Sequence, residues 1–295
     1  MIRLARMSET VTRLSIVIPA KDEAASLSAV LAELKRLHPD ADLIVVDDGS
    51  SDATGDRARA AGARVVRNPY SMGNGAAVKA GVRAARGTLT VCMDADGQHA
   101  PADVARLLEL QAQGYDMVVG ARTGGRSQAS PWRHLANTLY NALASWMTGH
   151  RILDLTSGFR VVDTVHFREF IHLLPNGFSY PTTITMAFFR AGYRVGYLPI
   201  EAAKRQGKSH VKPLRDGVRF LLIIFKIATL YSPLKIFLPI SALFFCTGVG
   251  YYIYTFVTYH RLTNMTGLLI ITSVLIFLIG LVSEQITTLM YSKQD

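Results

Sequence analysis

Three pairs of acidic residues follow closely after short apolar runs. The pairs are Asp22 with Glu23, Asp47 with Asp48, and Asp94 with Asp96, after the runs 14–18, 43–46 and 89–93. Such runs are typical of strands buried on both faces, and parallel strands end at one edge of their sheet, where ligands bind. We therefore expect the three pairs to converge on one crevice. Unpaired carboxylates are costly to hold together, so a crevice of this kind needs a cation or a donor-rich ligand.

The pair Asp94 and Asp96 offers two hard oxygen ligands one short turn apart, which suits Mg²⁺ or Mn²⁺. Surface turns also contain Asp-x-Asp, but this pair directly follows an apolar run, which favours a metal site that carries a diphosphate. For the pair Asp47 and Asp48 two interpretations stay open: Asp47 accepts from a base N–H or a ribose hydroxyl, or both residues cap the turn after their strand. Residues 73–75 (Gly-Asn-Gly) either direct backbone N–H groups at a phosphate or only start a helix.

A second set of candidate residues is cationic: Arg122, Arg133, Arg160 and Arg205. Arginines opposite a metal crevice suggest a second anion, such as an acceptor phosphate, although each alone also fits a solvated surface position. The sequence has no Gly-x-x-x-x-Gly-Lys-[Ser/Thr], no Gly-x-Ser-x-Gly and no His-Glu-x-x-His, which excludes these motif classes. Its eight histidines show no metal-ligand spacing, and only His99 stands beside the acids.

The elements that must position these residues alternate along the chain. Further strand-like runs lie at 64–67 and 117–119, and helical patterns lie at 27–37, 52–61, 75–85 and 101–111. Strands that alternate with helices predict an α/β fold with a doubly wound, mainly parallel sheet.

The last fifth of the chain has a different composition. Of the 54 charged residues among 295, only Lys235, Arg261, Glu284, Lys293 and Asp295 lie beyond residue 232. Residues 236–257 and 265–283 contain no formal charge, and each run is long enough to span a bilayer core of about 30 Å. The pattern predicts a two-helix transmembrane hairpin and excludes a uniformly soluble, disordered or rod-like protein.

The net charge of +10 is concentrated before that hairpin, with seven basic residues and one acid between residues 204 and 226. Basic residues next to a span bind anionic headgroups, so we expect a membrane partner and no nucleic acid. Residues 212–232 fit an amphipathic interfacial helix or, alternatively, a last helix of the soluble domain. The positive-inside rule places both termini on the cytoplasmic side of the membrane. Residues 1–13 lack the apolar run of a signal peptide, and two cysteines without ligand spacing fit a reducing compartment.

Six segments in this order resemble family 2 glycosyltransferases with the GT-A fold, and among them the polyprenyl-phosphate glycosyltransferases. They are residues 19–23, 46–52, 93–99, 120–122, 154–160 and 205–209. The resemblance covers roughly residues 14–232 and extends to the two-span tail of the bacterial members. Together with the hydropathy and charge patterns, it predicts an extension at 1–13, a cytoplasmic catalytic GT-A domain at 14–211 and a juxtamembrane amphipathic segment at 212–232. Transmembrane helices at 236–257 and 265–283 and a cytoplasmic tail at 284–295 complete the predicted organisation.

The resemblance also implies an activity: inverting transfer of a sugar from a UDP- or GDP-linked donor to an undecaprenyl- or dolichyl-type phosphate at the inner membrane. The residues carried over from the family fall into four groups. Pro19, Glu23 and Asp47 match the base and ribose site; Asp94, Asp96 and Gln98 match the ligands of Mg²⁺ or Mn²⁺; Arg122 and Arg133 match the grip on the lipid phosphate; Arg205 and Ser209 match a loop that closes over the diphosphate. A lipid phosphate is already anionic at pH 7, so its attack needs no general base.

Two departures from the family bear on the donor. Asp22 stands where the family usually has Asn, and residues 178–183 lack an acid that many members carry. The alternatives are a processive polysaccharide synthase, for which the Gln-x-x-Arg-Trp segment is absent, and a catalytically idle membrane scaffold that binds nucleotide sugars. Small residues in the spans, including Ser241, Ala242, Gly248 and Gly250, predict a homo-oligomer packed through 236–290.

Overall fold

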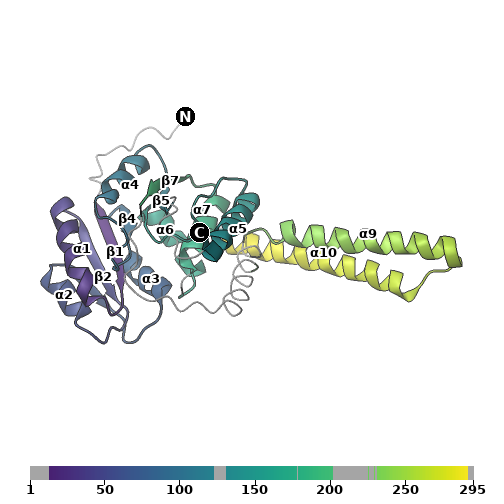
Figure 1. Cartoon of the computed structure of the whole chain (residues 1–295), viewed down its shortest axis with the longest axis horizontal. Helices are drawn as coiled ribbons and strands as arrows, with labels where there is room; N and C mark the ends of the chain where they lie inside the picture. Colours follow the sequence, from purple (N-terminus) through teal and green to yellow (C-terminus); the bar gives the residue numbers. More distant parts are fainter. Residues whose placement is uncertain are drawn as a thin grey trace. The chain divides into compact units, whose positions relative to one another are not determined.

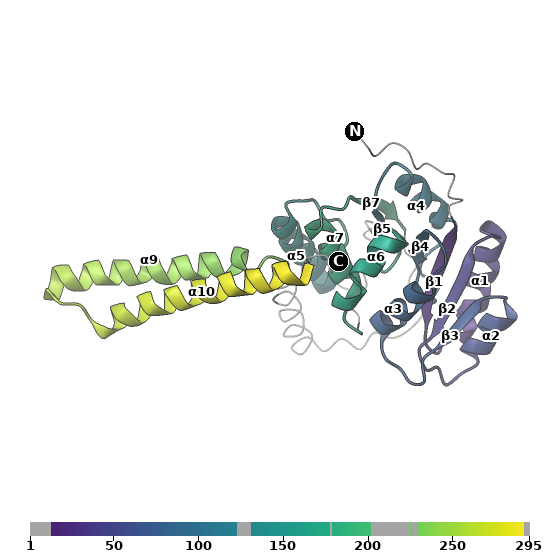
Figure 2. The same ribbon diagram turned by 180° about the vertical axis from the view of Figure 1, so that it is seen from behind.

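The computed structural model describes residues 13–122, 131–177, 179–201, 225, 229 and 231–291, and of residues 131–136 only the backbone. The chain divides into two compact units, residues 1–142 with 151–209 and residues 143–150 with 210–295. Figure 1 and Figure 2 show the elements from opposite sides.

The first unit is built on a seven-stranded sheet with the order β3-β2-β1-β4-β6-β5-β7. The strands are β1 (Leu14–Ala20), β2 (Asp42–Asp47), β3 (Arg64–Arg67), β4 (Leu89–Cys92), β5 (Met117–Arg122), β6 (Arg160–Asp163) and β7 (Val195–Ile200). Only β6 runs antiparallel to its neighbours, β4 and β5, and the other pairs are parallel. The mainly parallel α/β sheet is therefore confirmed, and the five strands predicted from sequence match β1 to β5 to within three residues.

Helices cover both faces of this sheet. They are α1 (Ala24–Leu37), α2 (Thr54–Ala60), α3 (Asn74–Ala84), α4 (Asp103–Gln111), α5 (Pro131–Thr148), α6 (Thr164–Glu169), the short 3₁₀ helix η1 (Ile171–Leu173) and α7 (Tyr180–Arg190). Alternate residues of β1 point to opposite faces: Ile16 and Ile18 join the core cluster that includes α1 and α4, whereas Val17 packs in the cluster of α3. Figure 1 shows α1 and α3 on either side of β1 and β2.

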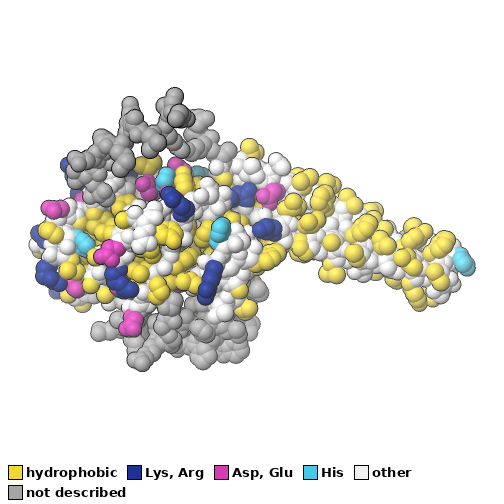
Figure 3. Space-filling view, turned by 90° about the horizontal axis from the view of Figure 1, so that it is seen from above, with side chains coloured by type: hydrophobic (Ala, Val, Ile, Leu, Met, Phe, Trp, Pro, Cys, Tyr) yellow, Lys and Arg dark blue, Asp and Glu magenta, His cyan; other side chains and the backbone are white. Residues whose placement is uncertain are grey.

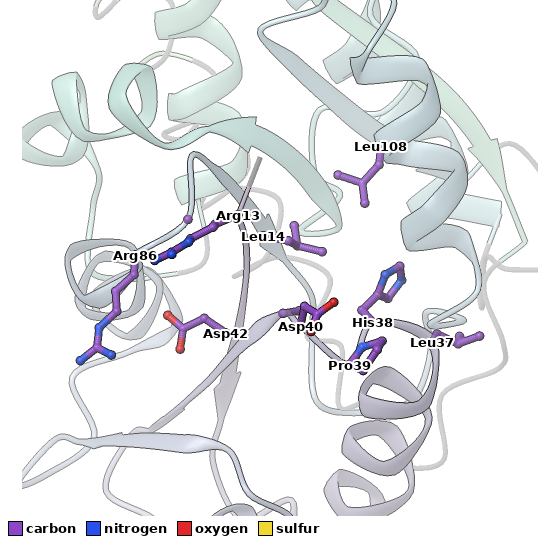
Figure 4. Close-up of a pocket in the computed structure, with 11 residues that line it drawn as sticks. Arg13, Leu14, Leu37, His38, Pro39, Asp40, Asp42, Arg86 and Leu108 are labelled. Carbon is purple, nitrogen blue, oxygen red and sulfur yellow. The ribbon is translucent and has the colours of Figure 1, made fainter. Parts of the chain in front are cut away.

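The carboxyl ends of β1, β2 and β4 lie at one edge of the sheet because these strands are parallel neighbours. Ala20 pairs with Asp47, and Val17 pairs with Cys92. The acidic pairs after these strands therefore share that edge, as predicted. A cavity of about 730 Å³ opens at the opposite edge, where Arg13, Leu14 and Asp42 mark the starts of β1 and β2 (Figure 4). It lies away from the acidic edge and takes no part in the candidate site.

The second unit contains the hairpin of α9 (Leu234–Tyr259) and α10 (Asn264–Tyr291). Both helices are long and apolar enough to cross a membrane, by length and composition. The expected spans lie inside them. On the face seen in Figure 3, hydrophobic side chains cover the length of the hairpin.

The seam between α9 and α10 consists of small residues at every seventh position. The buried residues are Ser241, Gly248 and Thr255 on α9, and Thr266, Ser273, Gly280 and Thr287 on α10. A seven-residue repeat keeps two helices facing each other along their length. Ser241 Oγ donates to Ser273 O at 2.9 Å, and Ser273 Oγ donates to Ser241 O at 3.0 Å. Ser241 and Gly248, which we expected to mediate contacts between copies, therefore pack inside one hairpin.

Both charged residues at the base of the hairpin serve helix ends. Glu284 Oε2 accepts from Leu234 N at 3.2 Å, at the first residue of α9. Lys235 Nζ donates to Met147 O at 2.7 Å, in the last turn of α5. Free N–H and C=O groups at helix ends need such partners. Helix α10 continues to Tyr291, through residues that we expected in the tail.

Candidate active site

Hydrogen bonds join the loops that follow β1 and β2. Asp22 N donates to Ser50 Oγ at 3.0 Å, and Asp22 Oδ1 accepts from Ser51 N at 2.8 Å and from Ser51 Oγ at 3.0 Å. The bonds from Ser51 hold the pKa of Asp22 below its usual value. Asp22 has φ +54°, a left-handed conformation that Asp and Asn adopt more readily than most residues. Only Oδ1 accepts these bonds, so the contacts of this loop need one acceptor oxygen on the side chain of residue 22.

Asp48 organises the loop after β3. Its carboxylate accepts from Asn68 Nδ2 at 2.7 Å and, each at 2.9 Å, from Ser71 Oγ, Met72 N and Gly73 N. Burial raises the pKa of Asp48, but these hydrogen bonds outweigh it, so the pKa lies below the usual value. With four donors from residues 68–73, Asp48 holds the loop after β3, and among the described residues none in the turn after β2 donates to its carboxylate.

The start of α3 is closed by another loop. Gly75 N donates to Gly177 O at 3.2 Å, and Ala76 N donates to Asn176 O at 3.0 Å. A methyl group on Gly75 would come within 2.1 Å of Pro175 O, so only glycine permits this approach. These N–H groups are occupied by backbone carbonyls, and the helix-start interpretation of residues 73–75 holds.

The three residues predicted to hold the base and ribose lie at the same edge. Pro19 is paired with Val46 inside the sheet, and Glu23 precedes α1, with its N–H bonded to Thr54 Oγ1 at 3.0 Å. Asp47 ends β2; its Oδ1 accepts from Ser50 N at 2.9 Å, and its Oδ2 lies 3.5 Å from Arg67 Nε. The capping role of Asp47 is therefore present, and Oδ2 is its less engaged oxygen.

Asp94 and Asp96 have fewer internal partners than the acids after β2. Asp96 Oδ1 accepts from Gln98 N at 3.1 Å. Asp94 Oδ2 lies 3.7 Å from Nε2 of the buried His99, and the Asp94 side chain is 36% exposed. In the described part of the chain, the other carboxylate oxygens of this pair have no donor.

Oxygen donors for a divalent cation are thus available at residues 94–98. Asp94, Asp96 and Gln98 are half-buried within one turn. Among the described residues, no three or more His, Cys, Asp or Glu side chains gather as metal ligands. A cation at this turn would therefore take the two carboxylates and complete its shell with the Gln98 amide oxygen and with oxygens of a ligand.

Arg122, at the end of β5, is held by a residue that we had not singled out. Asp154 Oδ2 accepts from Arg122 Nε at 2.8 Å, and Thr156 Oγ1 accepts from Nη2 at 2.7 Å. Burial lowers the pKa of Arg122, but the bonds and charge of Asp154 and the nearby charges of Asp94 and Asp96 raise it above its usual value. The cation is therefore permanent and lies within electrostatic reach of the acidic pair.

Arg160, which we grouped with the acceptor arginines, is placed differently. It is 0% exposed and donates to Pro181 O and Thr185 Oγ1, each at 3.1 Å, and to Ser157 O. Its guanidinium lies 5.9 Å from the centre of the Tyr180 ring. No carboxylate among the described residues forms an ion pair with it. Arg160 anchors the loop before β6 to the start of α7, and it does not face an acceptor.

The segment with the missing acid is also turned inward. Tyr180, Thr182 and Thr183 are buried; Thr182 Oγ1 donates to Leu155 O at 3.3 Å and accepts from Tyr140 OH at 3.1 Å. Of the remaining predicted site residues, Arg133 lies in α5 with only its backbone described, and Arg205 and Ser209 lie outside the described residues. The expected amphipathic helix at 212–232 also lies largely outside them.

The sequence matches two family models. Residues 15–171 match Glycosyl transferase family 2, and residues 232–289 match the GtrB C-terminal hairpin. The chain is 30% identical over 212 residues to the polyprenol monophosphomannose synthase of Mycolicibacterium smegmatis, covering 66% of this chain and 78% of that protein. It is 33% identical over 210 residues to the undecaprenyl-phosphate mannosyltransferase of Micrococcus luteus, covering 66% and 85%.

A solved structure is similar in fold. Glucosyl-3-phosphoglycerate synthase from Mycobacterium tuberculosis, in complex with Mn²⁺, UDP and glucosyl-3-phosphoglycerate, superposes with a TM-score of 0.59 at 25% identity. The match covers 74% of this chain and 79% of that one.

Proposed function

The chain belongs to glycosyl transferase family 2, and on that premise we propose that it transfers a sugar from a nucleotide-diphosphate sugar to a polyprenyl phosphate, with inversion at the sugar carbon. One observation carries the proposal: two half-buried carboxylates, Asp94 and Asp96, retain oxygens without internal donors beside the permanent cation of Arg122. A negative site for a metal therefore adjoins a positive site for an anion. Two curated relatives are named for transfer to polyprenyl-type phosphates.

Asp94, Asp96 and Gln98 hold Mg²⁺ or Mn²⁺ in this proposal. Carboxylate and amide oxygens are the donors that these ions prefer, and a related fold binds Mn²⁺ together with UDP. When bound, the ion neutralises the departing nucleotide diphosphate. Pro19, Glu23 and Asp47 hold the base and ribose, and a loop with Arg205 and Ser209 closes over the diphosphate.

The acceptor phosphate binds Arg122 and Arg133. Because the phosphate is already charged, the protein has only to orient it for in-line attack and to stabilise charge. Asp154 and Thr156 engage Nε and Nη2 of Arg122, and among the described residues nothing engages Nη1, which is the nitrogen proposed for the acceptor. The lipid phosphate attacks the anomeric carbon once as the nucleotide diphosphate leaves, and this single displacement inverts the configuration at that carbon.

The hairpin keeps the enzyme at the membrane that holds its acceptor, with the catalytic unit on the cytoplasmic side. Support comes from the exposed apolar residues of α9 and α10 and from Trp146, an exposed aromatic in the last turns of α5. Tryptophan is enriched at membrane interfaces. A homo-oligomer packed through 236–290 stays a proposal. Its contacts would use the outer side of the hairpin, where Gly250 faces open space.

The experiment is product identification. Purified full-length protein is incubated with Mg²⁺ or Mn²⁺, undecaprenyl phosphate and a panel of UDP- and GDP-sugars, and the glycolipid is identified by mass. We expect one sugar added to one lipid phosphate. A polymer would indicate the processive synthase, and nucleotide-sugar binding without any product would indicate the idle scaffold.

A further inference from the structure

Strand β3 carries two arginines that meet acids of β2 at opposite ends of the strand pair. At the amino end, Arg64 holds Asp42 with Nη2–Oδ2 at 2.6 Å and Nε–Oδ1 at 3.2 Å, and Nη2 also donates to Ala84 O at 2.7 Å. At the carboxyl end, Arg67 is the register partner of Asp47. Each pair joins an aspartate of β2 to an arginine of β3, so their contact distances can be compared directly.

The contact between Arg67 and Asp47 is loose. Arg67 Nε lies 3.5 Å from Asp47 Oδ2, and Arg67 Nη2 lies 3.4 Å from Ser50 O, whereas charge-assisted N–H···O bonds are typically about 2.7–2.9 Å long. The Arg67 side chain is 56% exposed and that of Asp47 only 2%. A buried carboxylate oxygen thus relies on one weakly held, exposed guanidinium at the edge where the donor nucleotide is proposed to bind.

We propose that Arg67 determines which nucleobase the donor carries. On binding, the base exchanges with the loose contact: a ring N–H donates to Asp47 Oδ2, and the adjacent ring carbonyl accepts from the Arg67 guanidinium. An acceptor beside a donor complements the N–H and C=O edge that uracil and guanine share. Adenine and cytosine present a ring nitrogen acceptor beside an amino donor, so in the same orientation the ring nitrogen would face Asp47 and the amino group would face Arg67, with both protein groups unsatisfied.

This inference rests on the proposed function, because it takes Asp47 as part of the donor site. The test is calorimetric binding of UDP, GDP, CDP and ADP to the full-length protein with Mg²⁺. The wild type is expected to bind UDP or GDP at least about tenfold more tightly than CDP and ADP, since one hydrogen bond to a charged group is worth about that factor. Arg67→Met should weaken the preferred nucleotide about tenfold and bring its affinity within about threefold of that for CDP.

Arg64→Met is the matched control, because it removes the other β3 arginine and leaves the carboxyl edge untouched. It should lower the thermal midpoint but keep the base preference. Arg67→Lys keeps the positive charge and loses the planar guanidinium. Its base preference should lie between those of the wild type and Arg67→Met, and it replaces Arg67→Met in the test if that variant fails to fold.

An unchanged base preference, or tighter binding, in a folded Arg67 variant would overturn the inference and leave the proposed function standing. Equal binding of all four nucleotides by the wild type would also overturn the inference about Arg67 without contradicting the proposed function. Binding of no nucleotide by the wild type would overturn the proposed function itself.

Discussion

Asp154 holds Arg122 through both carboxylate oxygens, with Nε–Oδ2 at 2.8 Å and Nη2–Oδ1 at 3.1 Å. The same Oδ1 accepts from Thr156 N at 3.0 Å and Ser157 N at 3.1 Å. The loop between α5 and β6 is thereby tied to the last residue of β5. A guanidinium held by two hydrogen bonds to one carboxylate keeps a fixed orientation. Asp154 is therefore a positioning residue: it orients Arg122 toward the proposed acceptor site.

Asp154→Asn should lower kcat/KM for polyprenyl phosphate by about 10- to 100-fold, because the amide cannot hold the guanidinium fork with two charged hydrogen bonds. The affinity for the nucleotide-sugar donor should change by less than about threefold, since none of the described donor-site residues, Pro19, Glu23 and Asp47, is hydrogen-bonded to Asp154. Steady-state kinetics with varied acceptor and direct nucleotide binding measure the two quantities. A loss confined to nucleotide binding would reverse our assignment of the two anion sites.

Asp96→Ala should abolish transfer while the protein stays folded, because it removes a proposed metal ligand without removing core volume. The assay is glycolipid formation under saturating Mg²⁺ or Mn²⁺, with the thermal midpoint as the check on folding. Activity above about a tenth of wild type, a loss of only ~1.4 kcal/mol in activation free energy, would take Asp96 out of the metal site.

Gly158 lies close to the carboxylate of Asp94. A methyl group at this position would stand 3.2 Å from both Asp94 Oδ2 and Tyr180 OH. Gly158→Ala should therefore displace the Asp94 carboxylate and raise the metal concentration needed for half-maximal rate by about tenfold, the effect of weakening one charged contact. Gly177→Ala is the control, because a methyl group there meets nothing within 4 Å. Equal metal titrations for both variants would contradict the placement of Asp94 at the metal.

The pKa of Asp48 predicts a pH dependence of stability. Since the pKa of Asp48 in the folded protein lies below the usual value of 3.8, the carboxylate stabilises the native state fully above pH 3.8 and progressively less as pH falls through the folded pKa. Asp48→Asn should lower the thermal midpoint at pH 7, and the gap to wild type should narrow below about pH 4. A gap that stays constant from pH 7 to pH 3 would show that the charge of Asp48 is not what holds residues 68–73.

The sequence predicted the first half of the sheet well because β1, β2 and β4 are apolar runs buried on both faces. Strand β6 was missed, and neither its length nor its first residue explains this, because β3 was predicted and also has four residues beginning with an arginine. Buried Arg160 donates to Pro181 O and Thr185 Oγ1, which lie 21 and 25 residues later in the chain. No local sequence pattern indicates a contact at that separation. Arg122 was found as a candidate, but its partner Asp154 was not, although it opens the segment 154–160 that supported the family resemblance.

The hairpin was predicted from its lack of charge, but its internal seam was not. The repeat of small residues at every seventh position, Ser241 to Thr255 and Thr266 to Thr287, was visible in the sequence and identifies the face that α9 and α10 share. This repeat distinguishes the residues that pack between α9 and α10 from those that face lipid or could contact a second copy.

Close packing of α9 against α10 should matter for activity on an acceptor that is embedded in the membrane. None of the residues proposed for the candidate site belongs to the hairpin, so its proposed role is to place the enzyme where a long lipid acceptor lies. Gly280 is closed in by Phe237, whose Cβ would be 2.5 Å from an added methyl group. Gly280→Leu should force the two helices apart, since overpacking of this kind costs about 1–3 kcal/mol or more. The full-length variant should lose activity on membrane-embedded undecaprenyl phosphate and keep it on a short, water-soluble polyprenyl phosphate.

Gly267→Leu, on the same helix but with open space around it, provides the comparison and should leave both rates near wild type. The measured quantity is the ratio of the long-lipid rate to the short-lipid rate in each protein, which cancels differences in expression and in active fraction. We expect this ratio to fall about tenfold or more in Gly280→Leu, if the hairpin contributes as much as one well-made contact, ~1.4 kcal/mol, to acceptor delivery. A ratio that is the same in wild type and both variants would mean that the packed hairpin does not deliver the acceptor, and its role would then be limited to attachment.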